Sequence, residues 1–387
     1  MLSAVLLTGA ASLAFTGGAS AATYTPASGP ALQAAVAAAN VNPGPDTIEL
    51  ADTTYVTTST ITITDTLRIT GDHASQAAGG GPRIDGSSIL PLQTEIVVVC
   101  AGVTATFEAF TLTESGSASA AIRDRGTLLA QNIAITGNAG VQLALTSGAA
   151  ATLTNSSISD GALAAVTATS ASLTLRNSTV AYNGQGGVLF NTPSVIHLNN
   201  TIVAKNDGSD FGSRDCSRAV AAQVSSLDSD GTCGVSITAD PLLGASALNG
   251  GPTPTLAPGA GSPAINAGNA GVCPGTDQRF FLRSGACDIG AYEVGAVRDT
   301  TPPTCVVTAI RAGPPKEQDV SAQDGGGGLG PAAISGLFIS NGAVAYAPFP
   351  APSNAPLVLS ATKTDQSDTT VWSFTATDWA GNATFCI

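Results

Sequence analysis

Apolar and polar residues alternate with a period of two through much of this chain, which is the pattern of half-buried β-strands. Short strands of this kind are predicted at residues 46–50, 60–63, 67–69 and 84–86. From there to about residue 240 the chain contains only short strand patterns separated by Gly, Asn and Ser. An earlier Ala-rich segment, residues 31–40, has helical spacing and is followed by Asn42-Pro-Gly-Pro45. We expect this helix to close the open end of a stacked sheet.

In the middle of the chain the alternation forms a repeat. The two clearest copies match position for position, and they are Leu173-Thr-Leu-Arg-Asn177-Ser-Thr-Val180-Ala-Tyr-Asn183 and Ile196-His-Leu-Asn-Asn200-Thr-Ile-Val203-Ala-Lys-Asn206. Weaker copies lie at residues 131–138 and 153–158. One Asn recurs with spacings of 23, 22 and 23 residues, at Asn132, Asn155, Asn177 and Asn200. A fixed period of this size indicates a repeat architecture.

Two repeat folds have a period in this range. Leucine-rich repeats place Asn three residues after the last strand Leu and contain further Leu positions, whereas here Asn177 follows Leu175 by two and the rest of each unit is Thr, Ser, Ala and Gly. We therefore predict an all-β fold, a right-handed parallel β-helix of about 22–23 residues per coil, with Leu173, Leu175 and Val180 pointing inward. Because Asn tolerates left-handed backbone and stacked Asn amides can hydrogen-bond between coils, the four recurring Asn are interpreted as a structural ladder.

A second unit is predicted after Asp299-Thr-Thr-Pro-Pro303, which reads as a boundary. Beyond it, short strand patterns recur at regular spacing and predict a small β-sandwich over residues 299–387. Two segments of this unit are interpreted as turns: Asp324-Gly-Gly-Gly-Gly-Leu-Gly330, which lacks the Lys-Ser/Thr of a phosphate-binding loop, and Asp378-Trp-Ala-Gly-Asn382.

Composition agrees with a stack of thin layers, since only 11% of the 387 residues are charged, 5% are aromatic and 44 are Gly. The 27 acidic and 14 basic residues give a net charge of −13, which argues against nucleic acid and anionic membranes as partners. Residues 1–21 read as a secretory signal peptide, and no later stretch is apolar for long enough to span a bilayer. We therefore expect residues 22–298 to form the β-helix of a secreted or cell-surface protein.

Seven cysteines in an exported chain predict a disulfide framework. Two pairs are suggested because their cysteines are close in sequence: Cys216 with Cys233, and Cys273 with Cys287. A third pair, Cys305 with Cys386, is suggested because both cysteines lie in the second predicted unit. Cys100 is left over. It follows an apolar strand pattern, where a thiol acts as a small buried hydrophobe.

Several short phrases stand out after residue 240, namely Asp240-Pro-Leu-Leu, Asn249-Gly-Gly-Pro, Gly261-Ser-Pro-Ala-Ile-Asn-Ala-Gly268, Thr276-Asp-Gln-Arg279 and Cys287-Asp-Ile-Gly-Ala-Tyr-Glu293. Together they resemble the choice-of-anchor Q domain of exported bacterial β-helix proteins of the pectin-lyase-like type, with the segment at residues 240–293. Residues 31–50 look like the CSLREA-type N-terminal region often paired with such helices. Residues 299–387 resemble the Ig-like modules of bacterial surface proteins. Asn266, Phe280 and Phe281 depart from the Q-domain pattern.

The β-helix fold that this resemblance implies also hosts pectate lyases and polygalacturonases. A lyase needs clustered carboxylates for calcium and a basic residue, and a polygalacturonase needs paired Asp with a nearby His. Neither set appears as a linear motif, and the two histidines, His73 and His197, lie in a loop and at an outward strand position. We therefore assign no catalytic residue. The alternative is a polysaccharide lyase or glycoside hydrolase whose carboxylates come from different coils.

Two kinds of charged group could still bind a ligand. Asp277, Arg279, Arg283 and Asp288 form the densest charged group and could hold a sugar or a carboxylate, although an internal ion-pair network that locks the segment is the favoured interpretation. Acidic loops at Asp207-Gly-Ser-Asp210 and Asp228-Ser-Asp-Gly231 have a spacing that calcium could use. No other cofactor is expected.

These features lead to one functional hypothesis and one alternative. The hypothesis is a non-catalytic exported protein for binding, adhesion or display, whose partner is a cell-surface glycan or another surface protein. The alternative is the polysaccharide-degrading enzyme described above.

Overall fold

The protein is described from a computed structural model, whose described residues are 21–71, 80–89, 95–115, 120–206, 214–324, 333–346, 356–365, 367, 369–378 and 381–387. The expected signal peptide up to residue 20, His73 and the acidic loop 207–210 lie outside them. Within the described residues, no helix is long and apolar enough to cross a membrane.

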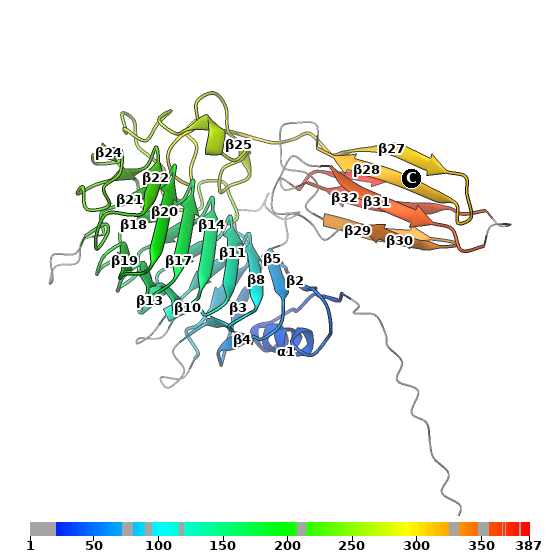
Figure 1. Cartoon of the computed structure of the whole chain (residues 1–387), viewed down its shortest axis with the longest axis horizontal. Helices are drawn as coiled ribbons and strands as arrows, with labels where there is room; N and C mark the ends of the chain where they lie inside the picture. Colours follow the sequence, from blue (N-terminus) through cyan, green and yellow to red (C-terminus); the bar gives the residue numbers. More distant parts are fainter. Residues whose placement is uncertain are drawn as a thin grey trace, which may run out of the picture.

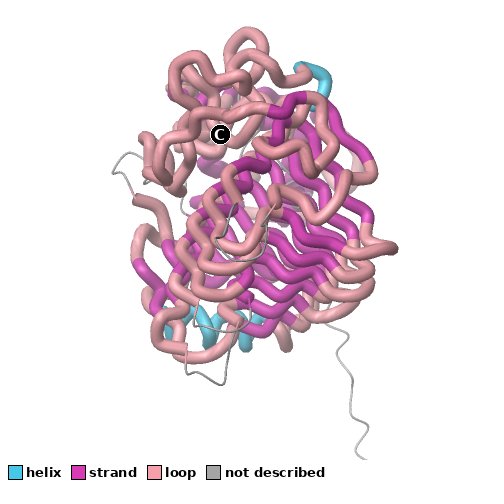
Figure 2. Tube along the Cα trace, turned by 90° about the vertical axis from the view of Figure 1, so that its left-hand side faces the viewer, coloured by secondary structure: helices cyan, strands magenta, loops and turns pink. Residues whose placement is uncertain are grey.

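Three parallel sheets wind around one core (Figures 1 and 2). The described strands of sheet A are β1 (Thr23–Tyr24), β2 (Asp46–Leu50), β5 (Leu67–Gly71), β8 (Thr104–Glu108), β11 (Thr127–Gln131), β14 (Ala150–Thr154), β17 (Ser172–Arg176), β20 (Val195–Asn199) and β22 (Ala222–Val224). Those of sheet B are β3 (Thr54–Val56), β6 (Arg83–Asp85), β9 (Thr111–Thr113), β12 (Ala134–Thr136), β15 (Ser157–Ser159), β18 (Thr179–Ala181), β21 (Ile202–Ala204), β23 (Leu227–Asp228) and β24 (Ile237–Thr238). Those of sheet C are β4 (Ile61–Ile63), β7 (Val97–Val99), β10 (Ala120–Asp124), β13 (Val141–Leu145), β16 (Val166–Ala168) and β19 (Val188–Phe190). The chain passes from A to B to C and returns to A, which confirms the predicted parallel β-helix.

The register places equivalent residues of successive repeats next to each other. Leu153 pairs with Leu175, which pairs with Leu198. Their side chains are fully buried, so each coil covers the apolar face of the coil before it. This is why small alternating residues suffice here, because the neighbouring coils supply the cover that a short strand cannot supply alone.

A short helix closes the first coils, as expected. It is α1 (Gly29–Ala39), which begins two residues earlier than residues 31–40 because the Ser28 side chain accepts a hydrogen bond from the Ala31 N–H at 3.3 Å and Pro30 occupies the first turn. Leu32 and Val36 are buried in the main core. Figure 1 shows the helix at the end of the stack beside β2 and β4.

Residues after 240 cover the outer face of sheet B with little regular structure. The described elements here are the 3₁₀ helix η2 (Ala270–Val272) and the strands β25 (Phe281–Leu282) and β26 (Val297–Arg298). Ala264 and Ile289 pack on Ile202 and Leu227 of sheet B. At Gly290, with φ of 104°, an added Cβ would lie 2.8 Å from Ile202, so only Gly allows this close approach.

The last part of the chain forms two antiparallel sheets, called here the C-terminal sheets and drawn to one side of the β-helix in Figure 1. One has the order β27 (Thr304–Arg311), β28 (Glu317–Gln323), β31 (Leu357–Thr362), β30 (Ala343–Tyr346). The other has the order β29 (Ala333–Ile339), β32 (Trp372–Thr377), β33 (Ala383–Cys386). Leu359 and Phe374 are buried in one cluster that both sheets share.

The structure contains three disulfides, which are the pairs that the sequence suggested: Cys216–Cys233, Cys273–Cys287 and Cys305–Cys386. Cys100 carries a free thiol and is partly buried against the main core. Cys305–Cys386 joins the first strand of one C-terminal sheet to the last strand of the other.

One inward position in sheet C carries an acid. Asp124 lies between Val99 and Leu145 in the stack and is 0% exposed. Its Oδ1 accepts a hydrogen bond from the Gly126 N–H at 2.8 Å, whereas Oδ2 has no hydrogen-bond partner. Burial raises the pKa of Asp124 from 3.8 to about 6, with the Gly126 hydrogen bond opposing the rise.

This acid makes the β-helix sensitive to pH. Because the folded pKa lies above the unfolded value, the contribution of Asp124 to stability is complete below about pH 4 and is lost as pH rises through about 6. The loss by pH 8 amounts to about 3 kcal/mol, from roughly two pKa units at about 1.4 kcal/mol each. The free energy of unfolding of Asp124→Asn relative to wild type should therefore increase by about 3 kcal/mol between pH 4 and pH 8, measured by urea denaturation and circular dichroism.

Asp365→Asn provides the control, because hydrogen bonds from Ser367 lower the pKa of Asp365. Its free energy of unfolding relative to wild type should change little between pH 4 and pH 8, because an acid with a lowered pKa loses its contribution to stability only as pH falls below its ordinary value. A difference between Asp124→Asn and wild type that stays constant from pH 4 to pH 8 would contradict the prediction.

Candidate functional site

The Asn ladder lies at the turn between sheets A and B and holds the C-terminal cover. All four backbones are left-handed, with φ between 40° and 53°, and Ala109 at the preceding slot has φ of 57°. The Asn155 side chain donates to the Thr276 carbonyl at 2.9 Å, and Asn132 donates to the carbonyls of Asp277 at 3.0 Å and Gln278 at 3.1 Å. Asn200 donates to the Asn269 carbonyl at 3.0 Å and accepts from its N–H at 2.7 Å.

The expectation that these Asn bond to one another holds at one step only, where Asn200 donates to Asn177 Oδ1 at 3.2 Å. The physical reason is that their amides face the residues 269–288, which offer backbone carbonyls that would otherwise be buried without donors. The Asn ladder therefore binds a later segment of the same chain, the cover that contains residues 269–288.

A second polar ladder, which the sequence analysis did not identify, lies at the turn between sheets B and C. Asn183 donates to Asn206 Oδ1 at 2.9 Å, and Asn206 donates to Asp215 Oδ1 at 3.1 Å. Gln142 donates to Asn183 at 3.4 Å. These residues are buried, so this ladder makes the coil-to-coil bonds that were expected of the first. The repeat itself could have predicted this second ladder, because its two clearest copies end on Asn183 and Asn206.

The candidate ligand group Asp277, Arg279, Arg283 and Asp288 is brought together, but inside the protein. The Asp277 carboxylate accepts from Arg279 Nε at 2.9 Å, and the two side chains are 0% and 4% exposed. The Arg279 guanidinium also lies 3.6 Å from the centre of the Tyr292 ring and 4.5 Å from that of Phe281. The guanidinium therefore contacts two aromatic rings, and its N–H donors bond to the chain itself.

Arg283 joins this group to the Asn ladder. Its Nη1 donates to Glu293 Oε2 at 2.8 Å, and its Nη2 donates to Asn155 Oδ1 at 3.2 Å and to the Gly290 carbonyl at 3.0 Å. Asp288 accepts from the N–H groups of Asn266 at 2.7 Å and Val294 at 2.6 Å. Glu293, which the sequence analysis did not single out, is the buried anion at the centre of these contacts.

The acidic loop at Asp228 is also internally satisfied. Asp228 Oδ2 accepts from the Cys233 N–H at 2.8 Å, and Oδ1 accepts from Thr238 Oγ1 at 3.0 Å. Asp230 accepts from Thr232 at 2.9 Å through the N–H and from the Asp215 N–H at 3.1 Å. Neither carboxylate therefore needs calcium to satisfy its oxygens.

The outer face of sheet A carries an extended line of side chains, which we call the outward row. It is set by the register of the parallel strands and consists of Arg68, Thr106, Leu129, Thr152, Thr174 and His197. The side chains are partly exposed, with Leu129 the most open at 41%. Sheet A is open toward the viewer in Figure 1, and no described element crosses its middle strands.

The charge in this row lies at one end, at Arg68. Arg68 forms an ion pair with Glu108 on the next strand, and Gln131 donates to the same carboxylate at 2.9 Å. Thr152 and Thr174 present hydroxyl groups on adjacent strands, which lie about 4.8 Å apart in a parallel sheet. Thr106 lies two strands before Thr152, with Leu129 between them. The centre of the row is an uncharged polar surface with one apolar position.

A shallow pocket of about 310 Å³ lies on a different side, beside β16 and β19. It is lined by Thr167, Ala168, Thr169, Leu189, Phe190, Asn191 and Ser217. The Arg218 guanidinium lies 5.9 Å from the centre of the Phe190 ring. The lining contains no acid, so the pocket does not supply the paired carboxylates of a hydrolase.

Comparison with known proteins supports the architecture. The family model described as "Right handed beta helix region" matches residues 96–240. Among solved structures, the crystal structure of pectate lyase Pel9A is 13% identical over 71% of this chain and 97% of that chain, with a TM-score of 0.38. No curated protein matches the sequence. The family match and the three parallel sheets together show that the chain contains a right-handed parallel β-helix.

Proposed function

We propose that this protein is an exported, non-catalytic binding protein that holds an uncharged glycan along the outward row of sheet A. The observation that supports this proposal is the row itself, in which Thr106, Leu129, Thr152 and Thr174 occupy four successive strands of an open face. Threonine hydroxyls can both donate to and accept from sugar hydroxyls. Leu129 adds an apolar contact for a sugar ring.

Charge supports a neutral ligand over an acidic one. The chain carries a net charge of −13, which would repel an acidic polysaccharide. Arg68 is paired with Glu108, and the residues of the row from Thr106 to Thr174 carry no charge.

The placement of the acids supports a non-catalytic role. Burial raises the pKa values of Asp124, Asp215 and Glu293. None of these carboxyl groups lies on the outward row, and each accepts hydrogen bonds from the protein. A general acid must reach the glycosidic oxygen, so these groups are badly placed for hydrolysis of a ligand on sheet A.

The proposal also includes a location outside the cell and a role for each of the two segments that follow the coils. Disulfides persist in oxidising compartments, so Cys216–Cys233, Cys273–Cys287 and Cys305–Cys386 support a secreted or cell-surface location. Residues 240–293 act as a choice-of-anchor Q-like cover. Residues 299–387 act as an Ig-like β-sandwich that displays the β-helix.

The test is binding of purified protein to a panel of insoluble and soluble polysaccharides, both neutral and acidic. Wild type should bind at least one neutral polymer, and Thr152→Glu should weaken that binding at least about tenfold, since it places a charge and a longer side chain at the centre of the row. Stability should change little, because surface substitutions in strands are usually tolerated.

Thr62→Glu is the matched control, since Thr62 is an exposed outward residue of β4 in sheet C. It should bind as wild type does. If Thr152→Glu bound the polysaccharide as tightly as wild type does, the outward row would not be the glycan-binding surface. Release of sugar products that is abolished by replacing one carboxylate would establish the degrading enzyme instead.

A further inference from the structure

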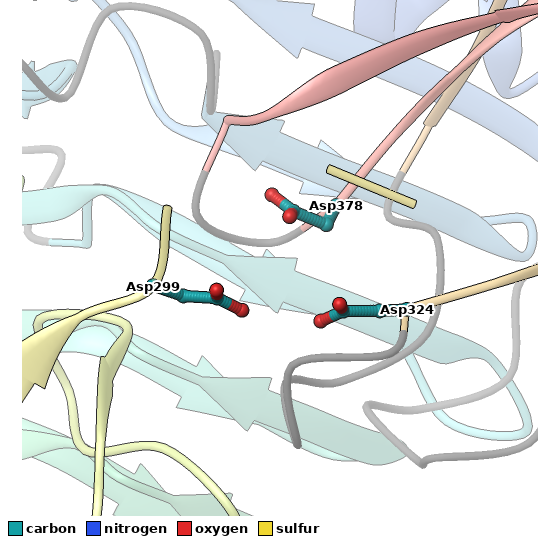
Figure 3. A group of neighbouring side chains, drawn as sticks. All are labelled: Asp299, Asp324 and Asp378. Atoms are coloured by element: carbon teal, nitrogen blue, oxygen red, sulfur yellow. The ribbon is translucent and has the colours of Figure 1, made fainter. Parts of the chain in front are cut away.

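Three aspartates from distant parts of the sequence meet at one end of the C-terminal sheets (Figure 3). Asp299 precedes β27, Asp324 follows β28 and Asp378 follows β32. One carboxylate oxygen of each lies within 4.8 Å of those of the other two. All three residues are buried, with exposed fractions of 2%, 7% and 1%.

Uncharged donors within the described residues bond to two of these carboxylates, Asp299 and Asp378. Asp299 Oδ1 accepts from the Thr301 N–H at 2.9 Å. Asp378 accepts from the Asn382 N–H at 2.8 Å and from its side-chain amide at 2.9 Å. Asp324 has interactions of its own, while its Oδ2 oxygen is enclosed by protein and accepts no hydrogen bond.

Such a group is costly when all three carboxylates are ionised. Like charges a few ångströms apart in a buried site oppose ionisation, and neutral donors stabilise a carboxylate without removing its charge. Either the carboxyl groups share protons or a cation lies among them. The three buried side chains point toward one another (Figure 3), which is the arrangement that a cation would complete.

We propose that Asp299, Asp324 and Asp378 bind one calcium ion. Calcium takes oxygen ligands at about 2.3–2.6 Å, so two oxygens on the same ion can lie up to about 5 Å apart, which matches the 4.8 Å limit among these three. The three donors are all hard oxygens, which disfavours zinc or copper. Magnesium keeps several waters and is bound less readily in a dry, protein-lined site.

The ion has a structural consequence that goes beyond glycan binding. Asp299 belongs to the connection that leaves the β-helix, whereas Asp324 and Asp378 end strands of two different C-terminal sheets. Calcium would therefore tie this connection to both sheets at their common end. The attachment of the C-terminal sheets to the rest of the chain would become calcium-dependent.

The test uses the full chain and calcium itself. Both tryptophans, Trp372 and Trp379, lie within residues 299–387, so tryptophan fluorescence follows the unfolding of this part. Wild type should melt at least about 5 °C higher with saturating calcium than with EDTA, because a ligand bound only to the folded state raises Tm. Asp324→Asn should lose this calcium increment and, in EDTA, should melt no lower than wild type, because one repulsive charge is gone.

Asp365→Asn, which removes an exposed acid from the same C-terminal sheets, should keep the full calcium increment. Identical melting of wild type in calcium and EDTA would overturn the proposal, as would an unchanged increment in Asp324→Asn. An equal increment with magnesium at the same concentration would overturn the assignment to calcium. Stabilisation of wild type by acid alone, with no response to calcium, would show that the carboxyl groups share protons instead.

Discussion

Replacing Arg283 by methionine is expected to destabilise the β-helix by about 3–5 kcal/mol, since it leaves a buried partner charge without its counter-ion. That partner is Glu293. Burial raises the pKa of Glu293, and a hydrogen bond from the Asp288 N–H and the charge of Arg283 oppose this rise. The substitution also removes donors to Asn155 and to the Gly290 carbonyl. Urea denaturation followed by circular dichroism would measure the loss of stability.

Two further variants show whether the effect comes from the buried charge. Arg283→Met combined with Glu293→Leu should recover much of the lost stability, because an apolar pair of similar volume needs no counter-ion. Lys205→Met removes a cation from the exposed ion pair with Asp240, whose two side chains are 38% and 48% exposed, and should change stability little. A double variant as unstable as Arg283→Met would contradict the prediction.

Removal of the Cys305–Cys386 disulfide is expected to cost the C-terminal sheets about 4–5 kcal/mol in the chain-entropy model of cross-linking. The bridge closes a loop with a sequence separation of 81, so the reduced chain gains much conformational freedom when it unfolds. Leu359 and Phe374 belong to a small core, which has little reserve stability without the bridge. Tryptophan fluorescence in urea should show that Cys305→Ala/Cys386→Ala unfolds at a much lower concentration.

The shorter Cys273–Cys287 loop supplies the comparison. Its sequence separation is 14, so its removal should cost about 3 kcal/mol in the same model. The tryptophan transition should not change in Cys273→Ala/Cys287→Ala, because both cysteines precede Asp299. A larger loss of stability there than in Cys305→Ala/Cys386→Ala would contradict the loop-length argument.

The sequence was most informative where each coil repeats the one before it. The recurring Asn predicted both the coil length and the left-handed turn, and the alternation around Leu173 and Leu175 predicted which side chains point inward. These features are local or nearest-neighbour properties, and a repeated pattern reports such properties directly.

The partners of the same Asn could not be predicted, because they lie far away in the sequence. Asn132 bonds to residues 145 and 146 positions later, and nothing near Asn132 indicates that approach. The role of Glu293 was hidden for the same reason. The aspartate group of the C-terminal sheets was also missed, since Asp299, Asp324 and Asp378 lie far apart in the sequence, each before a segment that contains Pro or Gly, and only the tertiary fold brings the three carboxylates together.

The cover on sheet B is synthesised after all the coils that it covers. Asn132 and Asn155 leave the ribosome more than a hundred residues before Thr276 and Asp277, the groups that satisfy their amides. Until then the coils present uncovered polar and apolar groups, and contacts of such high sequence separation form slowly. A truncation before residue 269 should therefore leave coils that aggregate, whereas one after the Glu293 region should leave a folded β-helix.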